Sequence, residues 1–323
     1  MKLVCDGLDL SEAIMQVSKG VSTKTTNPIL EGIKLMADED YLLLSATDLE
    51  LSIEKRIRAN VKIEGETVAP GRLFSEFIKK LNNEQIELDL NEDNILSVFY
   101  TDSVGKIQCL KSDEFPDIKK YDYIDYFEIT QKQLKNIINK TVFAVATNDV
   151  RPILKGCLIE IEKNTIKSVA LDGYRLAIAK SKIKNASKDF SIVVPAKNLK
   201  EISTFLEDND NTVKVYVQQS SLMMEIDNVK ITSRLLDGEF INYAQIIPTK
   251  FSSTVIINKE QFEDAIERAS LLSRVDKNNL IKFDIKEKVL QLLGKSEIAD
   301  INEKITISLK GNDLIIGFNV KYF

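Results

Sequence analysis

An internal repeat constrains the fold of this chain more than any other feature of its sequence. NPILEGIKL at 27–35 is matched by RPILKGCLI at 151–159, and SATDLELSI at 45–53 by ALDGYRLAI at 170–178. Asp172 follows Asp48 by 124 positions and Pro195 follows Pro70 by 125, so the second copy contains one added residue in this interval. Matches that keep one order over most of a repeat unit indicate two homologous domains.

A third, fainter copy follows. INKEQFEDAIERASLL at 257–272 has the helical spacing of ITQKQLKNIINKTVF at 129–143, and GFNVKYF at 317–323 falls where VAPGRLF falls in the first copy. The sequence stops there, about 45 residues before the pattern of the first copy is complete. We therefore predict three domains, at 1–120, 127–248 and 253–323, of which the third is incomplete.

Hydrophobic periodicity predicts the same elements twice within each complete copy. A helical stripe in the first 20 residues precedes three strand-like runs near 29–36, 41–46 and 49–58. A second helix then precedes strands near 84–90, 94–100 and 104–111, and helices at 131–142 and 196–206 repeat the scheme. The expected fold is α+β, with two strand–helix–three-strand halves in each domain. The residues expected to face inward from the first two helices are Leu10, Ala13, Ile14 and Val17, and Leu73, Phe74, Phe77, Ile78 and Leu81.

The residue types that are missing exclude several classes of enzyme. The 323 residues contain no histidine, which removes Ser-His-Asp and Cys-His catalysis and the usual nitrogen ligand of zinc. Neither a P-loop nor a G-x-G-x-x-G motif is present. Cys5, Cys109 and Cys157 stand far apart in apolar, strand-like surroundings, which is typical of buried free thiols. We predict no catalytic residue, cofactor or metal, and keep a carboxylate-dependent enzyme as an alternative.

The sequence also predicts a cytoplasmic protein that does not contact membranes. It has no apolar run of about 18 residues that could span a bilayer, and its first residues do not resemble a signal peptide.

Charge is distributed unevenly along the chain. The net charge is −5, yet the five predicted helices together carry +4, with the third-copy helix acidic at −2, and the remainder carries −9. Since helices of homologous domains lie in equivalent places, we expect their basic residues to share one surface that binds a polyanion. No aromatic residues alternate with these lysines, so backbone contact to duplex DNA is favoured over stacking on single strands. The basic residues are Arg72, Lys79, Lys80, Lys132, Lys135, Lys140, Lys197 and Lys200.

Eight motifs resemble, in the same order, those of the bacterial sliding clamps, the beta subunits of DNA polymerase III. They are NPILEGIKL, SATDLELSI, DEFPDI, NDVRPILKG, LDGYRLA, VVPAKNLKEI, LLDGEF and GFNVKYF. The resemblance implies a DNA clamp fold with helices on one side and sheets on the other, and a head-to-tail homodimer whose domains form a ring around duplex DNA, independent of DNA sequence. It also implies binding to the polymerase III alpha subunit, the clamp loader and other proteins with clamp-binding motifs, without catalysis or cofactors.

The resemblance also implies three sets of functional residues. The peptide-binding set is Leu154, Leu171, Gly173, Tyr174, Arg175, Leu176, Ile241, Gln245, Ile246, Asn319 and Tyr322. The DNA-binding set is Lys24, Arg72, Asn148 and Lys197. The dimer interface is Ile107 and Cys109 against Leu271 and Leu272, with Glu297, Asp300 and Glu303 nearby.

The repeated motif itself raises one structural expectation. Ile178 lies six positions after Asp172, whereas Ile53 lies five after Asp48, so we expect an extra residue in a bulge or bend at Gly173. Asp48 and Asp172 are expected to form turns rather than to catalyse a reaction.

The incomplete third copy predicts exposed sheet edges, a weak or aggregation-prone dimer and reduced binding of clamp motifs. The alternative function is a DNA-binding or repair scaffold that uses clamp domains without encircling DNA.

Overall fold

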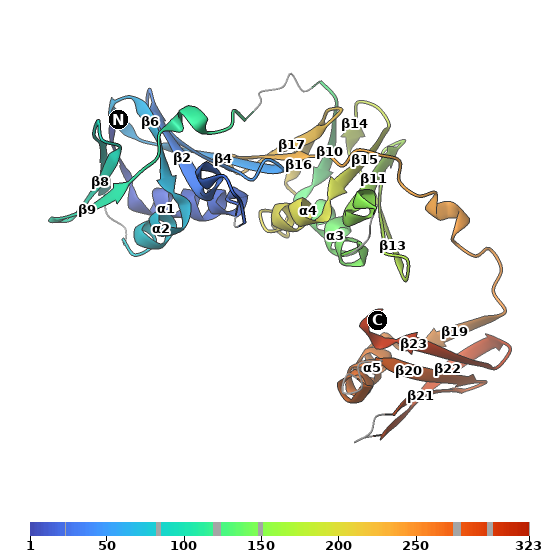
Figure 1. The fold of residues 1–323 in the computed structure, drawn as a ribbon. Helices are drawn as coiled ribbons and strands as arrows, with labels where there is room; N and C mark the ends of the chain where they lie inside the picture. The colour runs from blue at the N-terminus through green and yellow to red at the C-terminus, as the bar shows by residue number, and fades with distance from the viewer. Residues whose placement is uncertain are drawn as a thin grey trace. The chain divides into compact units, whose positions relative to one another are not determined.

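The structure, a computed structural model, describes residues 1–22, 24–81, 85–118, 124–147, 151–273, 279–295 and 300–322. The chain divides into two compact units, Met1–Phe240 and Ile241–Phe323, each of which is described by itself (Figure 1). The first unit contains the first two copies of the repeat, and the second unit contains the third copy.

The first copy consists of two halves, each with a helix between strands. The elements of the first half are β1 (Lys2–Asp6), α1 (Gly7–Val17), β2 (Gly32–Asp38), β3 (Tyr41–Thr47), β4 (Leu51–Arg58) and β5 (Asn60–Ile63). Those of the second half are β6 (Gly65–Pro70), α2 (Gly71–Ile78), β7 (Gln85–Leu90), β8 (Ile95–Tyr100) and β9 (Ser103–Gln108). The predicted strand and helix order is therefore confirmed, with the short strand β5 as an addition.

The second copy repeats this order. Its first half consists of β10 (Tyr126–Thr130), α3 (Gln131–Asn139), β11 (Gly156–Glu162), β12 (Thr165–Leu171), β13 (Leu176–Lys182) and β14 (Asn185–Ala186). Its second half consists of β15 (Phe190–Pro195), α4 (Ala196–Ser203), β16 (Thr212–Val217), β17 (Ser221–Ile226) and β18 (Val229–Arg234). Strand pairing repeats as well, because β1 pairs with β5 and β7 just as β10 pairs with β14 and β16.

A single antiparallel sheet joins the two copies. Its nine strands run in the order β14-β10-β16-β17-β18-β4-β3-β2-β6, so that β18 of the second copy pairs with β4 of the first. Ile231 lies opposite Ile53 in this register. The two smaller sheets have the orders β5-β1-β7-β8-β9 and β13-β12-β11-β15, so β9 is an edge strand of the first and β13 of the second, with β5 and β15 at the opposite edges.

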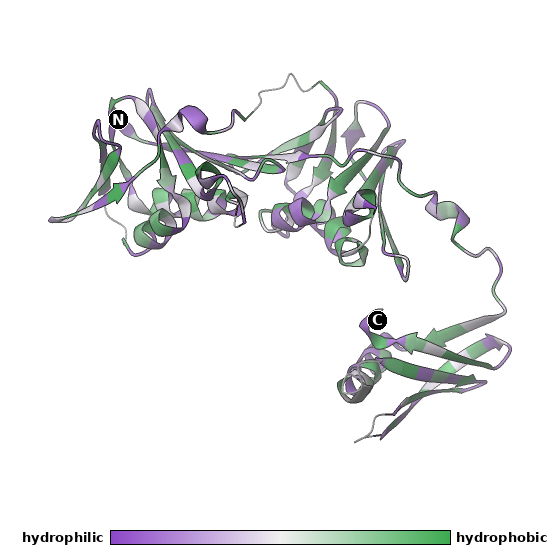
Figure 2. Ribbon diagram, in the orientation of Figure 1, coloured by the Kyte–Doolittle hydropathy of each residue, from purple (hydrophilic) through white to green (hydrophobic). Residues whose placement is uncertain are grey.

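The helices α1 to α4 lie on one side of the sheets, the lower side in Figure 1. Leu10, Ala13, Ile14 and Val17 of α1 are all buried, as predicted, and hydrophobic residues concentrate along the strands and the helix faces that pack on them (Figure 2). This arrangement agrees with the predicted fold class.

The prediction for α2 is wrong at one position. Phe74 and Ile78 are fully buried, but the side chain of Leu73 is 55% exposed. The buried stripe of α2 is centred on Phe74 and Ile78, and Leu73 lies about 100° from Phe74 around the helix, beyond the edge of that stripe. Phe77 and Leu81 are partly buried against the core, and Leu81 lies beyond the end of the helix.

The three cysteines are buried and free, as predicted. Burial raises the pKa of the Cys5 and Cys157 thiols to about 12 and that of the Cys109 thiol to about 11. All three side chains pack in the hydrophobic core of the first unit.

The second unit has its own core and one five-stranded sheet. Its elements are β19 (Ser253–Ile257), α5 (Lys259–Ser273), β20 (Leu280–Lys286), β21 (Val289–Lys295), β22 (Asp300–Gly311) and β23 (Leu314–Asn319), in the sheet order β19-β22-β21-β20-β23. The long strand β22 pairs first with β21 and then with β19, so it takes the places of both β13 and β14. Among the described residues of the whole chain, no helix is long and apolar enough to cross a membrane.

Candidate functional site

The two copies of the repeated motif form the same turn. The Asp48 carboxylate accepts hydrogen bonds from the backbone N–H groups of Glu50 (3.0 Å) and Leu51 (2.7 Å). The Asp172 carboxylate accepts from those of Tyr174 and Arg175, both at 3.1 Å. The expectation that these aspartates form turns is confirmed.

The prediction of an extra residue at Gly173 is wrong. The second turn residue is left-handed in both copies, with φ of 74° at Leu49 and 86° at Gly173. Strand pairing then resumes in the same register, because Thr47 pairs with Ser52 as Leu171 pairs with Leu176. The matching of Ile178 to Ile53 was misleading, since Ile178 takes the position of Glu54. The added residue lies between Lys182 and Phe190, where the offset changes from 124 to 125.

Arg175 makes the second turn chemically different from the first. Its Nε lies 3.1 Å from the Asp172 carboxylate and its Nη2 donates to the Phe143 carbonyl at 2.7 Å. The guanidinium carbon lies 5.4 Å from the centre of the Phe143 ring. The residue at the same turn position in the first copy, Leu51, is buried instead. Arg175 is thus held by the turn and by Phe143, a residue that the sequence prediction did not include.

Six of the predicted peptide-binding residues belong to the first unit. Leu154 and Leu171 are buried in its interior, whereas Tyr174 is 78% exposed and Leu176 is partly buried. Gly173 faces open space, because a Cβ atom added there would meet nothing within 4 Å. The hairpin from Leu171 to Ile178 therefore presents an exposed surface with apolar and aromatic side chains, to which Ile178 and Phe143 also contribute.

The other five predicted peptide-binding residues belong to the second unit. Ile241, Gln245 and Ile246 lie in its first segment, with Gln245 and Ile246 exposed. Asn319 ends β23, and its side chain accepts a hydrogen bond from the backbone N–H of Lys321 at 3.0 Å. Tyr322 is the last residue of the short 3₁₀ helix that follows β23.

A pocket in the first unit occupies the repeat-equivalent place of the predicted peptide-binding residues. Its volume is about 380 Å³. Thr47, Leu49, Glu50 and Ser52 line it at positions equivalent to Leu171, Gly173, Tyr174 and Leu176. Pro116, Asp117, Ile118, Ser220, Ser221, Thr232 and Arg234 complete the lining. Thr47 and Ser52 place hydroxyl groups where the second copy has Leu171 and Leu176, so the two sites differ in the ligands they favour.

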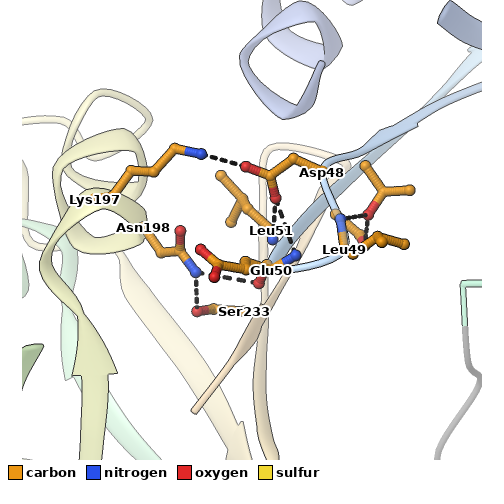
Figure 3. A network of polar contacts seen from close by, with 9 residues as sticks. Asp48, Leu49, Glu50, Leu51, Lys197, Asn198 and Ser233 are labelled. Carbon is orange, nitrogen blue, oxygen red and sulfur yellow. Dashed lines mark hydrogen bonds and ion pairs between the residues drawn. The ribbon is translucent and has the colours of Figure 1, made fainter. Parts of the chain in front are cut away.

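Polar contacts hold the first turn against the second copy (Figure 3). The Asn198 amide donates to the carbonyl of Glu50 at 3.1 Å and to the Ser233 hydroxyl at 2.8 Å, and the N–H of Arg234 donates to the same carbonyl at 2.8 Å. Lys197 forms an ion pair with Asp48. These contacts lie beside the pairing of β4 with β18 and reinforce the joint between the two copies.

Three basic residues occupy the second position of a helix and pair with a carboxylate. Arg72 on α2 pairs with Glu76 at 3.0 Å, Lys132 on α3 pairs with Asp208 at 3.4 Å, and Lys197 on α4 pairs with Asp48. Of the predicted DNA-binding residues, Arg72 and Lys197 are thus on the helix-bearing side of the first unit, and Lys24 is exposed. Asn148 lies outside the described residues.

The predicted dimer residues lie in different environments. Ile107 and Cys109 are buried in the first copy, so the backbone of the edge strand β9 and its exposed side chains, such as Val104, are what a partner could contact there. Leu271 on α5 is exposed. Glu303 accepts two hydrogen bonds from Arg268, at 2.7 and 3.1 Å, which hold the pKa of this carboxyl below its usual value. Asp300 begins β22, Glu297 lies outside the described residues, and the side chain of Leu272 is not described.

Comparison with known proteins covers nearly the whole chain. Residues 1–119, 128–242 and 244–323 match the N-terminal, central and C-terminal domains of the DNA polymerase III beta subunit. The beta sliding clamp of Bacillus subtilis is 33% identical over 334 residues, which cover 100% of this chain and 88% of the relative. That of Staphylococcus aureus is 32% identical over 314 residues, which cover 94% of this chain and 83% of the relative.

Solved structures agree with these relatives. The crystal structure of the DNA polymerase sliding clamp from Bacillus subtilis has a TM-score of 0.95 and 32% identity, and the match covers 99% of this chain and 88% of the chain in that structure. The DNA polymerase III subunit beta from Pseudomonas aeruginosa has a TM-score of 0.93 at 27% identity, with coverage of 99% and 88%. The chain therefore belongs to the DNA polymerase III beta subunit family, the bacterial sliding clamps.

Proposed function

We propose that this protein encircles duplex DNA as a ring-shaped homodimer and tethers the replicative polymerase to it for processive synthesis. The observation that carries this proposal is the pairing of β18 with β4, which sets two copies of one fold side by side with all four helices on the same side. If the same joint recurs between successive copies, the helices line one continuous inner surface and the sheets form the outer one.

The contact to DNA is made through phosphates and is independent of sequence. Lys24, Arg72, Asn148 and Lys197 are the proposed ligands. Lys79 and Lys80 just after α2, Lys140 just after α3 and Lys200 on α4 add positive charge near the helices. These four lysines form no ion pair with another described residue, so they are available to phosphate oxygens.

The dimer would form by the joint already present inside the chain. The edge strand β9 takes the repeat position of β18, and β22 takes that of β4. We propose that β9 of one protomer pairs with β22 of its partner, with Leu271 and Leu272 packing beside that seam. The buried side chains of Ile107 and Cys109 would support β9 from behind rather than contact the partner.

The proposed docking site for the polymerase III alpha subunit, the clamp loader and other partners is the hairpin from Leu171 to Ile178. Peptide motifs bind where an apolar surface is combined with a few polar anchors. Tyr174 and Leu176 supply the apolar part of this hairpin, and Ile241, Gln245, Ile246, Asn319 and Tyr322 of the second unit remain proposed peptide-binding residues. The protein itself would make or break no bond and would need no cofactor, and we propose that it acts in the cytoplasm.

The test compares circular and linear DNA. Protein is loaded by the clamp loader onto a nicked circular plasmid and onto the same plasmid after linearisation, and the retained protein is measured by gel filtration. An encircling clamp stays on the circle and leaves the linear molecule through its ends. Equal loss from both would instead favour a DNA-binding scaffold that does not encircle.

A further inference from the structure

Some basic residues on the helix-bearing side form an ion pair with a carboxylate of the same chain. Arg72, Lys132 and Lys197 each have one within ion-pair distance. A phosphate that approaches such a cation must compete with the resident carboxylate, so the cation releases fewer counterions and contributes less to DNA affinity. The carboxylates therefore bear on how strongly this surface binds DNA.

The three pairs differ in how easily they separate. The side chains of Arg72 and Glu76 are 91% and 67% exposed, and such pairs are weak in water. Lys132 and Asp208 are exposed as well, and they lie farther apart. The Asp48 side chain is only 9% exposed, and two backbone N–H groups of its own turn hold its other carboxylate oxygen. Asp48 therefore cannot turn away from Lys197, whereas Glu76 and Asp208 can leave their partners.

The repeat shows that the pairing of Lys197 does not simply copy that of its counterpart. Arg72 and Lys197 are equivalent positions, as are Glu76 and Glu201, since each pair is separated by 125 positions. Arg72 pairs with Glu76 inside α2, but Lys197 pairs with Asp48 of the other copy. Near Glu201, the Lys19 ammonium donates to Thr204 Oγ1 at 2.6 Å; burial lowers the pKa of Lys19, and the charge of Glu201 partly opposes that shift. Carboxylates are thus supplied to equivalent cations from different elements.

We propose that Asp48, Glu76 and Asp208 are built-in counterions that lower the affinity of the helix-bearing surface for DNA, with Asp48 the strongest of the three. This inference rests on the proposed function. The lysines of this surface that have no carboxylate partner among the described residues would attract phosphates. The counterions would keep Arg72, Lys132 and Lys197, near the helix N-termini, from holding any single phosphate tightly.

The experiment measures the affinity of the full chain for a fluorescein-labelled linear duplex by anisotropy, at salt concentrations from about 50 to 200 mM. The variants are Asp48→Asn, Glu76→Gln and Asp208→Asn. Asn at position 48 keeps an oxygen for the two backbone N–H groups. The matched control is Glu54→Gln, which removes the same charge from the pair with Lys230 on β4 and β18. Glu54 lies on the sheet face opposite that of the buried Ile53, which packs beneath the helices.

The expected order of affinity gain is Asp48→Asn, then Glu76→Gln, then Asp208→Asn, with Asp48→Asn binding about two- to fivefold more tightly than wild type at low salt. The slope of log affinity against log salt should steepen by about 0.9 for each cation that gains a phosphate. Glu54→Gln should change the affinity and the salt slope by no more than the general effect of removing one negative charge from the protein. Equal gains in all four variants, or no gain with Asp48→Asn, would overturn the inference.

Two further measurements keep the result interpretable. Urea unfolding of each variant shows whether the turn at Asp48 is intact, and Glu76→Gln and Asp208→Asn test the inference even where Asp48→Asn is unstable. Retention on circular DNA tests the proposed function separately. A wild type that binds linear duplex but leaves circles would fail as an encircling clamp and would still give a valid comparison of charges. The absence of linear-duplex binding in every variant, with normal retention on circles, would overturn the inference and leave the proposed function intact.

Discussion

The side-chain amide of Asn198 donates a hydrogen bond of 3.1 Å to the main-chain carbonyl of Glu50, although 148 positions separate the two residues. The same amide reaches the Ser233 hydroxyl, and the Asn198 side chain is fully buried. A sequence repeat thus becomes a physical joint, because a residue of one copy satisfies the backbone of the other.

Replacing Asn198 by Ala should destabilise this joint. The change leaves the buried Ser233 hydroxyl without this partner and removes one donor from the Glu50 carbonyl, at a cost of about 1–3 kcal/mol in the free energy of unfolding. Urea unfolding followed by circular dichroism checks the value. Asn60→Ala, at an exposed position of β5, is the control and should stay within about 0.5 kcal/mol of wild type. Equal losses of stability from the two substitutions would show that the Asn198 hydrogen bonds do not stabilise the joint.

Glycine should be favoured at the second residue of both equivalent turns. Gly173→Ala forces a Cβ atom into a left-handed backbone with φ of 86° and should cost about 1 kcal/mol, because space is open and only backbone strain opposes it. Leu49→Gly relieves strain at φ of 74° and should be neutral or stabilising, since this leucine is largely exposed. Thermal unfolding of both variants tests the pair. A destabilised Leu49→Gly would show that its side chain contributes packing that outweighs the strain.

Peptide binding should follow the chemical difference between the repeated turns. Leu176→Ser gives the second copy the residue that the first copy has at Ser52, and it should weaken binding of a synthetic peptide from the polymerase III alpha subunit by at least about fivefold. Ser52→Leu, the reciprocal change in the pocket of the first copy, is the control and should leave that affinity unchanged. Isothermal titration calorimetry measures both. A normal affinity with Leu176→Ser would remove this residue from the proposed docking site.

The buried thiols should make stability fall in alkaline solution. Their pKa values are raised from 9.0 to about 12 for Cys5 and Cys157 and to about 11 for Cys109, because burial disfavours the thiolate. The unfolded chain therefore loses these protons first as the pH rises. The stability contributed by the neutral thiols is complete below pH 9 and is lost progressively as the pH rises toward 12.

Thiol accessibility checks this prediction directly. A disulfide reagent at pH 8 should modify none of the three cysteines in folded protein and all three in guanidinium, because each side chain is buried. The single variant Cys157→Ser, followed by urea unfolding at pH 7 and at pH 10, should show a smaller decrease between the two pH values than wild type. A decrease of the same size would assign the alkaline instability to other groups.

Periodicity predicted those features that depend on local sequence. The stripe from Leu10 to Val17 identified α1 and its buried face, since the spacing of apolar residues matches the helical repeat. The same reasoning failed at Leu73, because the four apolar residues of α2 cover a wider arc of the helix than is fully buried. The very short strands β5 and β14 were not predicted, since runs of four and two residues carry too little pattern.

Periodicity could not predict features that depend on residues far apart in the sequence. Matching letters aligned Ile178 with Ile53, but the hydrogen bonds of Asp48 and Asp172 set the real register of the turns. The ion pair of Lys197 with Asp48 spans 149 positions, and it arises only because β18 pairs with β4. The basic helices were recognised from charge alone, whereas the carboxylates that accompany them come from a turn, a helix and a loop.

The antiparallel seam between β4 and β18 also has a mechanical meaning. Residues Leu51–Lys55 pair with residues Val229–Ser233 across it. A force along these strands loads all the hydrogen bonds between them together, whereas a force that peels the strands apart from one end breaks the hydrogen bonds one after another. Sideways peeling should therefore need far less force than lengthwise sliding.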